Sequence, residues 1–259
     1  RQYGLAAVRG GADCREEVVA QLVELQRDAG EYLARDGLVA RERQFVAEQN
    51  ALVAKNAEAY YRSMFDRDDN SWNVRDRHMA DTLEGLIEHY RGVQAPAKAV
   101  VWAHNSHLGD CRATDMSARG EINLGQLVRQ RFGDEASYLV GMTTYEGTVS
   151  AASNWEEPVD RKRLRPARED SVEGLFHEVA DPYFVLPFDA TAVASRLDDR
   201  RHQRAVGVVY RPETELASHY FKARLASQFD AVVHLDRSRA LEPLDPTDAW
   251  RAGEDLPET

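Results

Sequence analysis

The sequence has few cysteines and no long apolar run, and each shortage excludes a class of protein. Cys14 and Cys111 are the two cysteines of the chain. Two cysteines so far apart make no disulfide framework, which favours a reducing, cytoplasmic compartment. No apolar run approaches the roughly 18 residues that a membrane-crossing helix needs, so we expect no membrane partner.

A surplus of basic charge is also missing. Lys and Arg number 33 against 44 Asp and Glu, which gives a formal net charge of −11. A protein that binds nucleic acid needs a basic face to meet phosphate, so we expect no nucleic-acid partner. The basic run at residues 160–165 is interleaved with acid and is more typical of a solvated loop than of a docking patch.

The composition that remains is that of a globular protein. Its 259 residues are 43% hydrophobic and 30% charged, enough for a sizeable core in one large domain or two modest ones. Apolar residues recur at helical spacing in the first third and predict helices at about residues 15–35, 41–65 and 73–90. We interpret residues 1–95 as the helical part of a domain.

After Pro96 short apolar, β-branched runs alternate with helix candidates, which indicates βα units. The predicted fold is α/β, with a mainly parallel central sheet in residues 96–240 and a large helical layer from the first part. Residues 241–259 are predicted as a tail or linker. The expected strands are 99–103, 137–142, 183–186, 205–210 and 231–235, and the expected helices are 121–132, 172–179 and 215–228.

Two histidines follow the first of these strands. In open α/β sheets, ligands bind beyond the carboxyl ends of the strands, and His104 and His107 lie at such an end. Imidazole has an unperturbed pKa of about 6.5, so a pair of histidines three residues apart can move protons near neutral pH. We therefore interpret both as candidate catalytic residues; the alternative is that one caps the strand and the other faces solvent.

Two other chemistries remain open at this segment. His104 and His107 with Asp110 or Cys111 have the ligand types of a zinc site, although no second ligand pair is evident downstream. Ser106 lies beside a histidine, but it lacks the Gly-x-Ser-x-Gly turn that would hold a nucleophile out.

The remaining polar residues are weaker candidates. Glu121 stands at the expected start of a helix, where the helix dipole favours a carboxylate, and it could equally orient a histidine. Spacing alone gives Arg75 no functional role. His177, His219 and His234 are isolated in the sequence and are expected to be structural or exposed.

At these residues the sequence resembles the erythromycin esterase family, over nearly the whole chain. The most specific elements are Ala-His-Asn-x-His at residues 103–107 and Arg-Asp-x-x-Met-Ala at residues 75–80. These motifs are most similar to those of a broad bacterial branch whose members are sometimes joined to a phosphoribosyltransferase domain. A fused or neighbouring domain outside this chain is therefore one expected partner. The stretches that carry the resemblance are 71–80, 100–110, 119–129, 141–149, 210–215 and 218–221.

The resemblance implies a metal-independent, cofactor-free α/β esterase that hydrolyses a small-molecule carboxylic ester. The best-known members open macrolide lactones and so confer antibiotic resistance, with a histidine acting as general base on water. His104 and His107 match cleft histidines of the family. Arg75 and Glu121 match recurrent charged positions, and Asn105 is carried over as a supporting residue.

One departure is large. The family places its principal base in a Gly-Glu-x-x-His-Gly-like motif near its N-terminus, and here the first histidine is His78. We therefore expect the chain to match the C-terminal two-thirds of the family domain, and to be inactive alone by the family mechanism. The alternatives are a metal-dependent hydrolase that uses His104, His107 and Asp110, or a non-catalytic ligand-binding or stress protein on the same fold.

Overall fold

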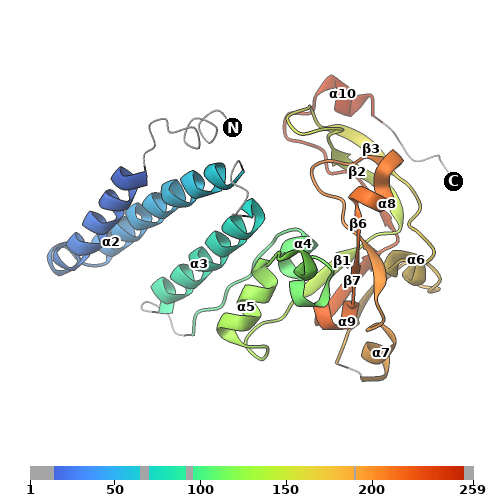
Figure 1. Ribbon diagram of the computed structural model, residues 1–259, viewed down its shortest axis with the longest axis horizontal. Coiled ribbons are helices and arrows are strands. Elements are labelled where there is room, and N and C mark those ends of the chain that lie inside the picture. Colours follow the sequence, from blue (N-terminus) through green and yellow to red (C-terminus); the bar gives the residue numbers. More distant parts are fainter. Residues whose placement is uncertain (1–14, 65–69, 92–95, 190, 254–259) are drawn as a thin grey trace. The chain divides into compact units, whose positions relative to one another are not determined.

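The computed structural model describes residues 15–64, 70–91, 96–189 and 191–253 (Figure 1). Its internal contacts divide the chain into two units, residues 1–101 and residues 102–259, which are described separately. No helix in the described ranges is long and apolar enough to cross a membrane.

In its described residues, the first unit has two paired helices, α2 (Arg15–Ser63) and α3 (Ser71–Arg91). The two helices predicted at residues 15–35 and 41–65 belong to one helical element, α2. Gly37 between them costs about 1 kcal/mol of helix stability relative to alanine, but it does not end a helix as proline would. The helices are tied by His89, which stacks on Phe45 at 4.0 Å and bonds Glu42 at 2.9 Å.

The second unit is a mixed α/β assembly with three small sheets. The first sheet has the strand order β1-β7-β4, the second β3-β2-β8, and the third β5-β6. The strands are β1 (Val140–Thr143), β2 (Glu146–Ala151), β3 (Asp160–Leu164), β4 (Tyr183–Pro187), β5 (Arg201–Arg204), β6 (Tyr220–Ala223), β7 (Ala231–Leu235) and β8 (Arg237–Ser238).

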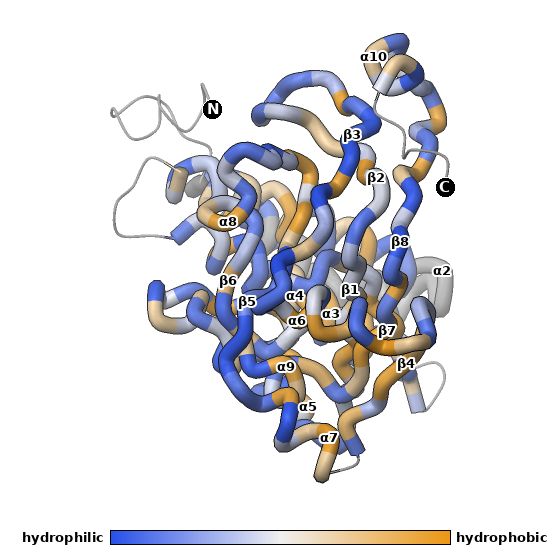
Figure 2. Tube along the Cα trace, turned by 90° about the vertical axis from the view of Figure 1, so that its right-hand side faces the viewer, coloured by the Kyte–Doolittle hydropathy of each residue, from blue (hydrophilic) through white to orange (hydrophobic). Residues whose placement is uncertain are grey.

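Short helices connect these strands and cover the first sheet. The main core of the unit forms around Phe229, Leu225 and Val232, and in Figure 2 the hydrophobic residues of this unit gather around β7, α9 and α7. The helices are α4 (Asn105–Leu108), α5 (Leu124–Phe132), α6 (Val172–His177), α7 (Thr191–Arg196), α8 (Glu215–Ser218), α9 (Leu225–Gln228) and α10 (Asp248–Arg251), with single 3₁₀ turns η1 (Cys111–Ala113), η2 (Ser117–Arg119) and η3 (Pro212–Thr214).

The α/β class is confirmed, but the mainly parallel sheet is wrong. β1 runs parallel to β7, whereas β4 pairs antiparallel with β7 and β2 pairs antiparallel with β3. The prediction assumed one long crossover helix between successive strands, which parallel neighbours require. Only β2 and β3 are joined by a short segment, residues 152–159, whereas residues 188–230 separate β4 from β7 and contain β5 and β6.

The predicted strand at residues 99–103 is also absent. These residues have no strand partner within the described ranges, and Val100 and Trp102 are 98% and 85% exposed. A continuous apolar run is buried on both faces only where neighbouring strands exist to cover it. The apolar composition was therefore read correctly, but nothing in the described residues pairs with it.

Three predicted strands are confirmed at β1, β4 and β7, while the region between β4 and β7 differs. The strand expected at 205–210 lies instead at β5, and the helix expected at 215–228 is divided into α8, β6 and α9. β6 begins with Tyr220 and Phe221, aromatic residues that favour strands, and its pairing with β5 supplies the backbone hydrogen bonds that a helix would have made.

Within the stretch predicted as a tail or linker, α10 packs against β3. Trp250 is buried, and its indole nitrogen donates to Ser150 Oγ at 2.9 Å. The Arg161 guanidinium lies 5.3 Å from the centre of the Trp250 ring. Residues up to Gly253 therefore belong to the second unit's folded structure.

Candidate functional site

The predicted histidine segment forms a single tight helical turn, α4, with His104 as its N-cap. The ring Nε2 of His104 lies 3.1 Å from the Val206 carbonyl oxygen. Because a carbonyl only accepts, the ring proton sits on Nε2, and Nδ1 accepts from the Ser106 hydroxyl at 2.8 Å and the Ser106 amide at 3.2 Å. Both ring nitrogens of His104 are therefore bonded inside the protein.

These surroundings keep the His104 ring neutral. Although part of the residue is exposed, desolvation by the protein around the ring lowers the pKa of His104 from its ordinary value of 6.5, the bond to Val206 opposes this, and His107 lowers the pKa further. At neutral pH the ring is an uncharged hydrogen-bond donor and acceptor. It holds the loop in place instead of carrying a charge.

Asn105 fastens the same turn to the edge of the first sheet. Its amide nitrogen donates to the Met142 carbonyl oxygen at 2.5 Å, and its amide oxygen accepts from the Met142 backbone nitrogen at 3.0 Å. The side chain thus pairs with β1 as a neighbouring peptide unit would. This places both histidines beside the carboxyl end of a strand, where the sequence had placed them beside a different one.

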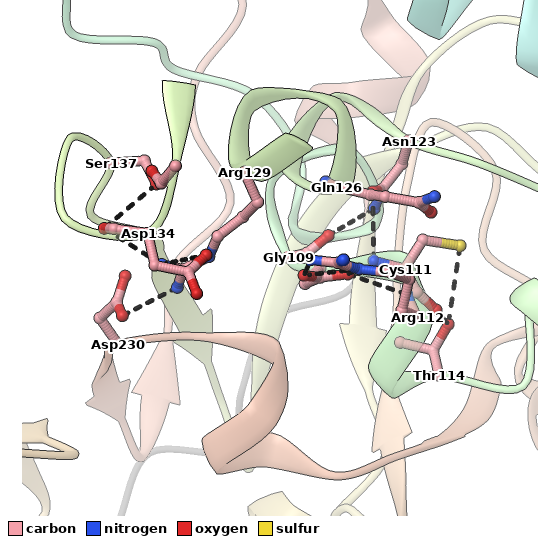
Figure 3. Close-up of polar contacts among 12 residues, drawn as sticks. Gly109, Cys111, Arg112, Thr114, Asn123, Gln126, Arg129, Asp134, Ser137 and Asp230 are labelled. Atoms are coloured by element: carbon pink, nitrogen blue, oxygen red, sulfur yellow. Dashed lines mark hydrogen bonds and ion pairs between the residues drawn. The ribbon is translucent and has the colours of Figure 1, made fainter. Parts of the chain in front are cut away.

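Asn123, which was not predicted as a site residue, also holds the loop (Figure 3). The residue is 2% exposed. Its amide nitrogen donates to the carbonyl oxygens of Ser106 and Gly109 at 2.8 and 2.6 Å, and its amide oxygen accepts from the backbone nitrogens of Cys111 and Gln126 at 3.2 and 3.0 Å. One side chain therefore caps helix α5 and fixes the loop.

The close approach of loop and helix depends on Gly125. A Cβ atom there would lie 2.1 Å from the Leu108 carbonyl oxygen and 2.7 Å from the Gly109 carbonyl oxygen, and both are backbone atoms that cannot turn aside. A glycine at the start of a helix is a sequence signal for such a contact, as is an asparagine in the N-cap position.

The far end of α5 is anchored to the first sheet. Arg129 donates to Asp230 Oδ1 at 2.8 Å, and Asp230 Oδ2 accepts from the Leu139 backbone nitrogen at 2.6 Å (Figure 3). Asp230 directly precedes β7 and Leu139 directly precedes β1. The helix that holds the histidine loop is thus itself fixed to both parallel strands.

The other predicted residues have structural partners. Glu121 pairs with Arg119 at 3.0 Å. Arg75 lies on α3 in the first unit, where its guanidinium stacks over Trp72 at 5.0 Å. Neither observation gives the residue a chemical role, and both assignments stay predictions.

The metal ligands weighed for this segment do not fit a metal. Both carboxylate oxygens of Asp110 bond Arg112, at distances from 2.6 to 3.2 Å. The buried Cys111 thiol donates to the Glu121 carbonyl oxygen at 3.2 Å. Among the described residues, no group of three or more His, Cys, Asp or Glu side chains is arranged to hold a metal ion.

Two of the histidines that looked isolated in the sequence meet in space. Asp236 Oδ1 lies 2.8 Å from His177 Nδ1 and 3.5 Å from His234 Nε2. The third, His219, is buried and accepts from the Arg211 backbone nitrogen at 3.0 Å, as expected of a structural residue. Sequence spacing could not reveal the contact between His177 and Asp236, because 59 positions separate the two residues.

Comparison with known proteins identifies the family. A model of the family described as erythromycin esterase matches residues 1–238. The chain belongs to the erythromycin esterase family. The family's α/β fold is also that of two solved structures. A protein from Bacillus cereus is 16% identical with a TM-score of 0.64, covering 87% of this chain and 53% of its own. A mutant of the erythromycin esterase EreC in its open conformation is 19% identical with a TM-score of 0.54, and the match covers 86% of this chain and 50% of the mutant.

The chain thus spans about half the length of these solved relatives. A curated DNA ligase of Stenotrophomonas maltophilia is 29% identical over 103 residues, which are 39% of this chain and 12% of the ligase. Family membership leaves the activity, the substrate and the mechanism of this chain as separate questions.

Proposed function

We propose that the chain forms part of a carboxylic ester hydrolase, of the kind that opens an ester or macrolactone with water, and that residues 104–107 line its cleft. The observation that carries this proposal is the fixed histidine loop. Asn105 and Asn123 both hold it by hydrogen bonds, and His104 is bonded through both ring nitrogens. Such preorganisation is what a hydrolytic site needs from its supporting groups.

The chemistry assigns different tasks to the two histidines. Water oxygen bonds to the ester carbonyl carbon while a base takes its proton; the C–O bond then breaks and the leaving alkoxide is protonated. In the family pattern that base comes from the upstream Gly-Glu-x-x-His motif. His104 fixes the loop, and His107 orients the water or donates a hydrogen bond to the developing oxyanion.

Substitution of each histidine tests this proposal in a protein that spans the whole length of the family domain. We expect His107→Ala to lower kcat for ester hydrolysis by about 10²–10⁴-fold, the range that positioned proton-transfer groups supply, and His104→Ala to lower kcat by releasing the loop that carries His107. The melting temperature of His107→Ala should stay close to that of the wild type, whereas His104→Ala should melt lower because it loses the bonds to Ser106 and Val206. His202→Ala, outside the loop, is the control. Wild-type hydrolysis in both loop variants would contradict the proposal.

Two alternatives have their own outcomes in the same protein. A metal-dependent hydrolase would lose activity with a chelator and regain it with zinc; the pairing of Asp110 with Arg112 argues against it. A ligand-binding or stress protein would bind a macrolide or another ester without turnover. Cytoplasmic location, a role in antibiotic resistance and the identity of the small-molecule ester stay predictions.

A further inference from the structure

A carboxylate between two histidines lies at the carboxyl ends of the parallel strands β1 and β7. Asp236 follows β7 directly, and backbone bonds on both sides fix it. Its nitrogen donates to the Pro182 carbonyl oxygen at 2.9 Å, and its carbonyl oxygen accepts from the nitrogens of Tyr145 and Glu146 at 3.1 and 3.0 Å. The backbone of Asp236 is therefore held against two other chain segments.

The two histidines that share this carboxylate differ in access. His234 is fully buried, and its Nδ1 lies 2.9 Å from Thr143 Oγ1. The side chain of His177 is 43% exposed, and its ring lies flat on Tyr145, with centroids 3.6 Å apart and planes 5° from parallel. Within the described ranges, His177 Nε2 makes no hydrogen bond. Only His177 can exchange a proton with a ligand or with solvent.

The Asp236 bond decides which nitrogen of His177 can react. A carboxylate accepts from Nδ1–H, so the lone pair of the neutral ring is on Nε2. A base oriented by a carboxylate, with its second nitrogen open, is the arrangement that activates a water or hydroxyl nucleophile in hydrolases. Stacking on Tyr145 restricts the ring further. We propose that His177 is the general base of a second acid–base site, with Asp236 as its positioning residue.

The charges around this site select the ligand. Partial burial raises the pKa of Tyr145, and the carboxylates of Glu146, Asp236, Glu169 and Glu178 raise it further. An anionic ligand would meet the same repulsion that opposes a tyrosinate. The site fits a neutral or cationic acyl compound.

The reaction that the site supports is hydrolysis of such an acyl compound. His177 Nε2 takes a proton from water, the water oxygen bonds to the acyl carbon, and the carbonyl electron pair moves onto its oxygen. The intermediate collapses by breaking the bond to the leaving oxygen, which receives the proton back from the imidazolium. The step needs no oxidant, metal or cofactor, and it does not rest on the function proposed for residues 104–107.

Two probes test the proposal in this chain. Diethylpyrocarbonate acylates the open nitrogen of a neutral imidazole, and mass spectrometry resolves its rate at each histidine; p-nitrophenyl acetate is a neutral ester that reports turnover. We expect Asp236→Asn to slow acylation of His177 several-fold and to lower kcat for the ester by about 10²–10⁴-fold. KM should stay close to that of the wild type, and Asp236→Glu should restore part of the rate. His177→Gln should abolish the turnover.

A matched pair elsewhere in the second unit supplies the control. His202 Nδ1 lies 3.2 Å from Asp170 Oδ2, so Asp170→Asn removes a similar carboxylate from a histidine that does not stack on Tyr145. Wild-type rates in Asp236→Asn, equal effects of Asp170→Asn, or no ester turnover above buffer by the wild type would each overturn the proposal. The acylation rate of His177 can be measured even if residues 104–107 contribute no activity, so the two proposals can fail independently.

Discussion

Both ring nitrogens of His104 are bonded within the protein, whereas His177 keeps one nitrogen open and has its other held by a carboxylate. The first ring is bonded mainly by its own neighbour in sequence, Ser106, and the second by a residue 59 positions away. A histidine that caps its own turn gains rigidity and loses reactivity. His177 is oriented by a carboxylate from a distant part of the sequence, and its other ring nitrogen stays free to react.

Gly125→Ala should have the largest effect, because it disrupts the contact between α5 and the loop that carries His104. The new Cβ would lie 2.1 Å from a backbone oxygen of the histidine loop, so we expect the free energy of unfolding to fall by about 3 kcal/mol or more. Urea denaturation measures it. The His177 acylation rate should stay unchanged in the folded variant.

Gly207→Ala is the matched control for that substitution. A Cβ at Gly207 meets no atom within 4 Å, and the residue adjoins Val206, which accepts from His104. We expect a change in the free energy of unfolding of less than about 1 kcal/mol. Equal losses in the two variants would show that the loop and α5 do not approach as described.

Glu173→Gln tests the helix that carries His177, because both residues lie on α6. Burial is the largest cause that raises the pKa of Glu173, from 4.5 to about 7. Below pH 4.5 the carboxyl is protonated in both folded and unfolded chains. As pH rises to about 7 the unfolded chain loses this proton first, so stability falls, by at most about 3 kcal/mol.

The glutamine variant cannot ionise, so its advantage should appear with rising pH. We expect Glu173→Gln to be more stable than the wild type by up to about 3 kcal/mol above pH 7, and nearly equal to it near pH 4.5. Its oxygen can still accept from the Arg204 backbone nitrogen. Urea denaturation across pH measures the difference, and a constant difference at all pH values would contradict the buried neutral carboxyl.

Asn123→Asp separates the two tasks of this side chain. Aspartate keeps the oxygen that caps α5, since Asp is as good an N-cap as Asn, but it loses the donors to Ser106 and Gly109. We expect a loss of about 2 kcal/mol in the free energy of unfolding and a fall in ester hydrolysis in the family-length protein. If Asn123→Asp matches the wild type in both, the amide does not hold the loop.

Ser106→Ala should have the smallest effect. It removes the hydroxyl that donates to His104 Nδ1, while the backbone donor of residue 106 remains. The expected cost is about 1 kcal/mol or less, and kcat should stay within about tenfold of the wild type, because water and not Ser106 attacks the ester. Complete loss of hydrolysis, with an acyl group trapped on residue 106, would make the serine a nucleophile.

The sequence predicted the parts of this site that depend on neighbours along the chain. The α/β class and the three strands of the first sheet follow from local pattern, whereas residues 104–107 were expected to follow a strand and instead form a helical turn. The hydrogen bonds of Asn123 and Val206 to that turn, and of Asp236 to His177, depend on which strands pair. Composition does not specify this pairing. The apolar run at 99–103 shows the same limit, because burial requires a partner strand as well as apolar residues.

The most direct test of the account is the titration of the His104 ring, followed through its ring carbon–proton signals by nuclear magnetic resonance. The hydrogen bonds of His104 require a neutral ring that donates Nε2–H to Val206 and accepts from Ser106 at Nδ1. We therefore predict a pKa for His104 below the ordinary value of 6.5, with the proton of the neutral ring on Nε2. A pKa at or above 6.5, or a neutral ring protonated on Nδ1, would contradict this prediction.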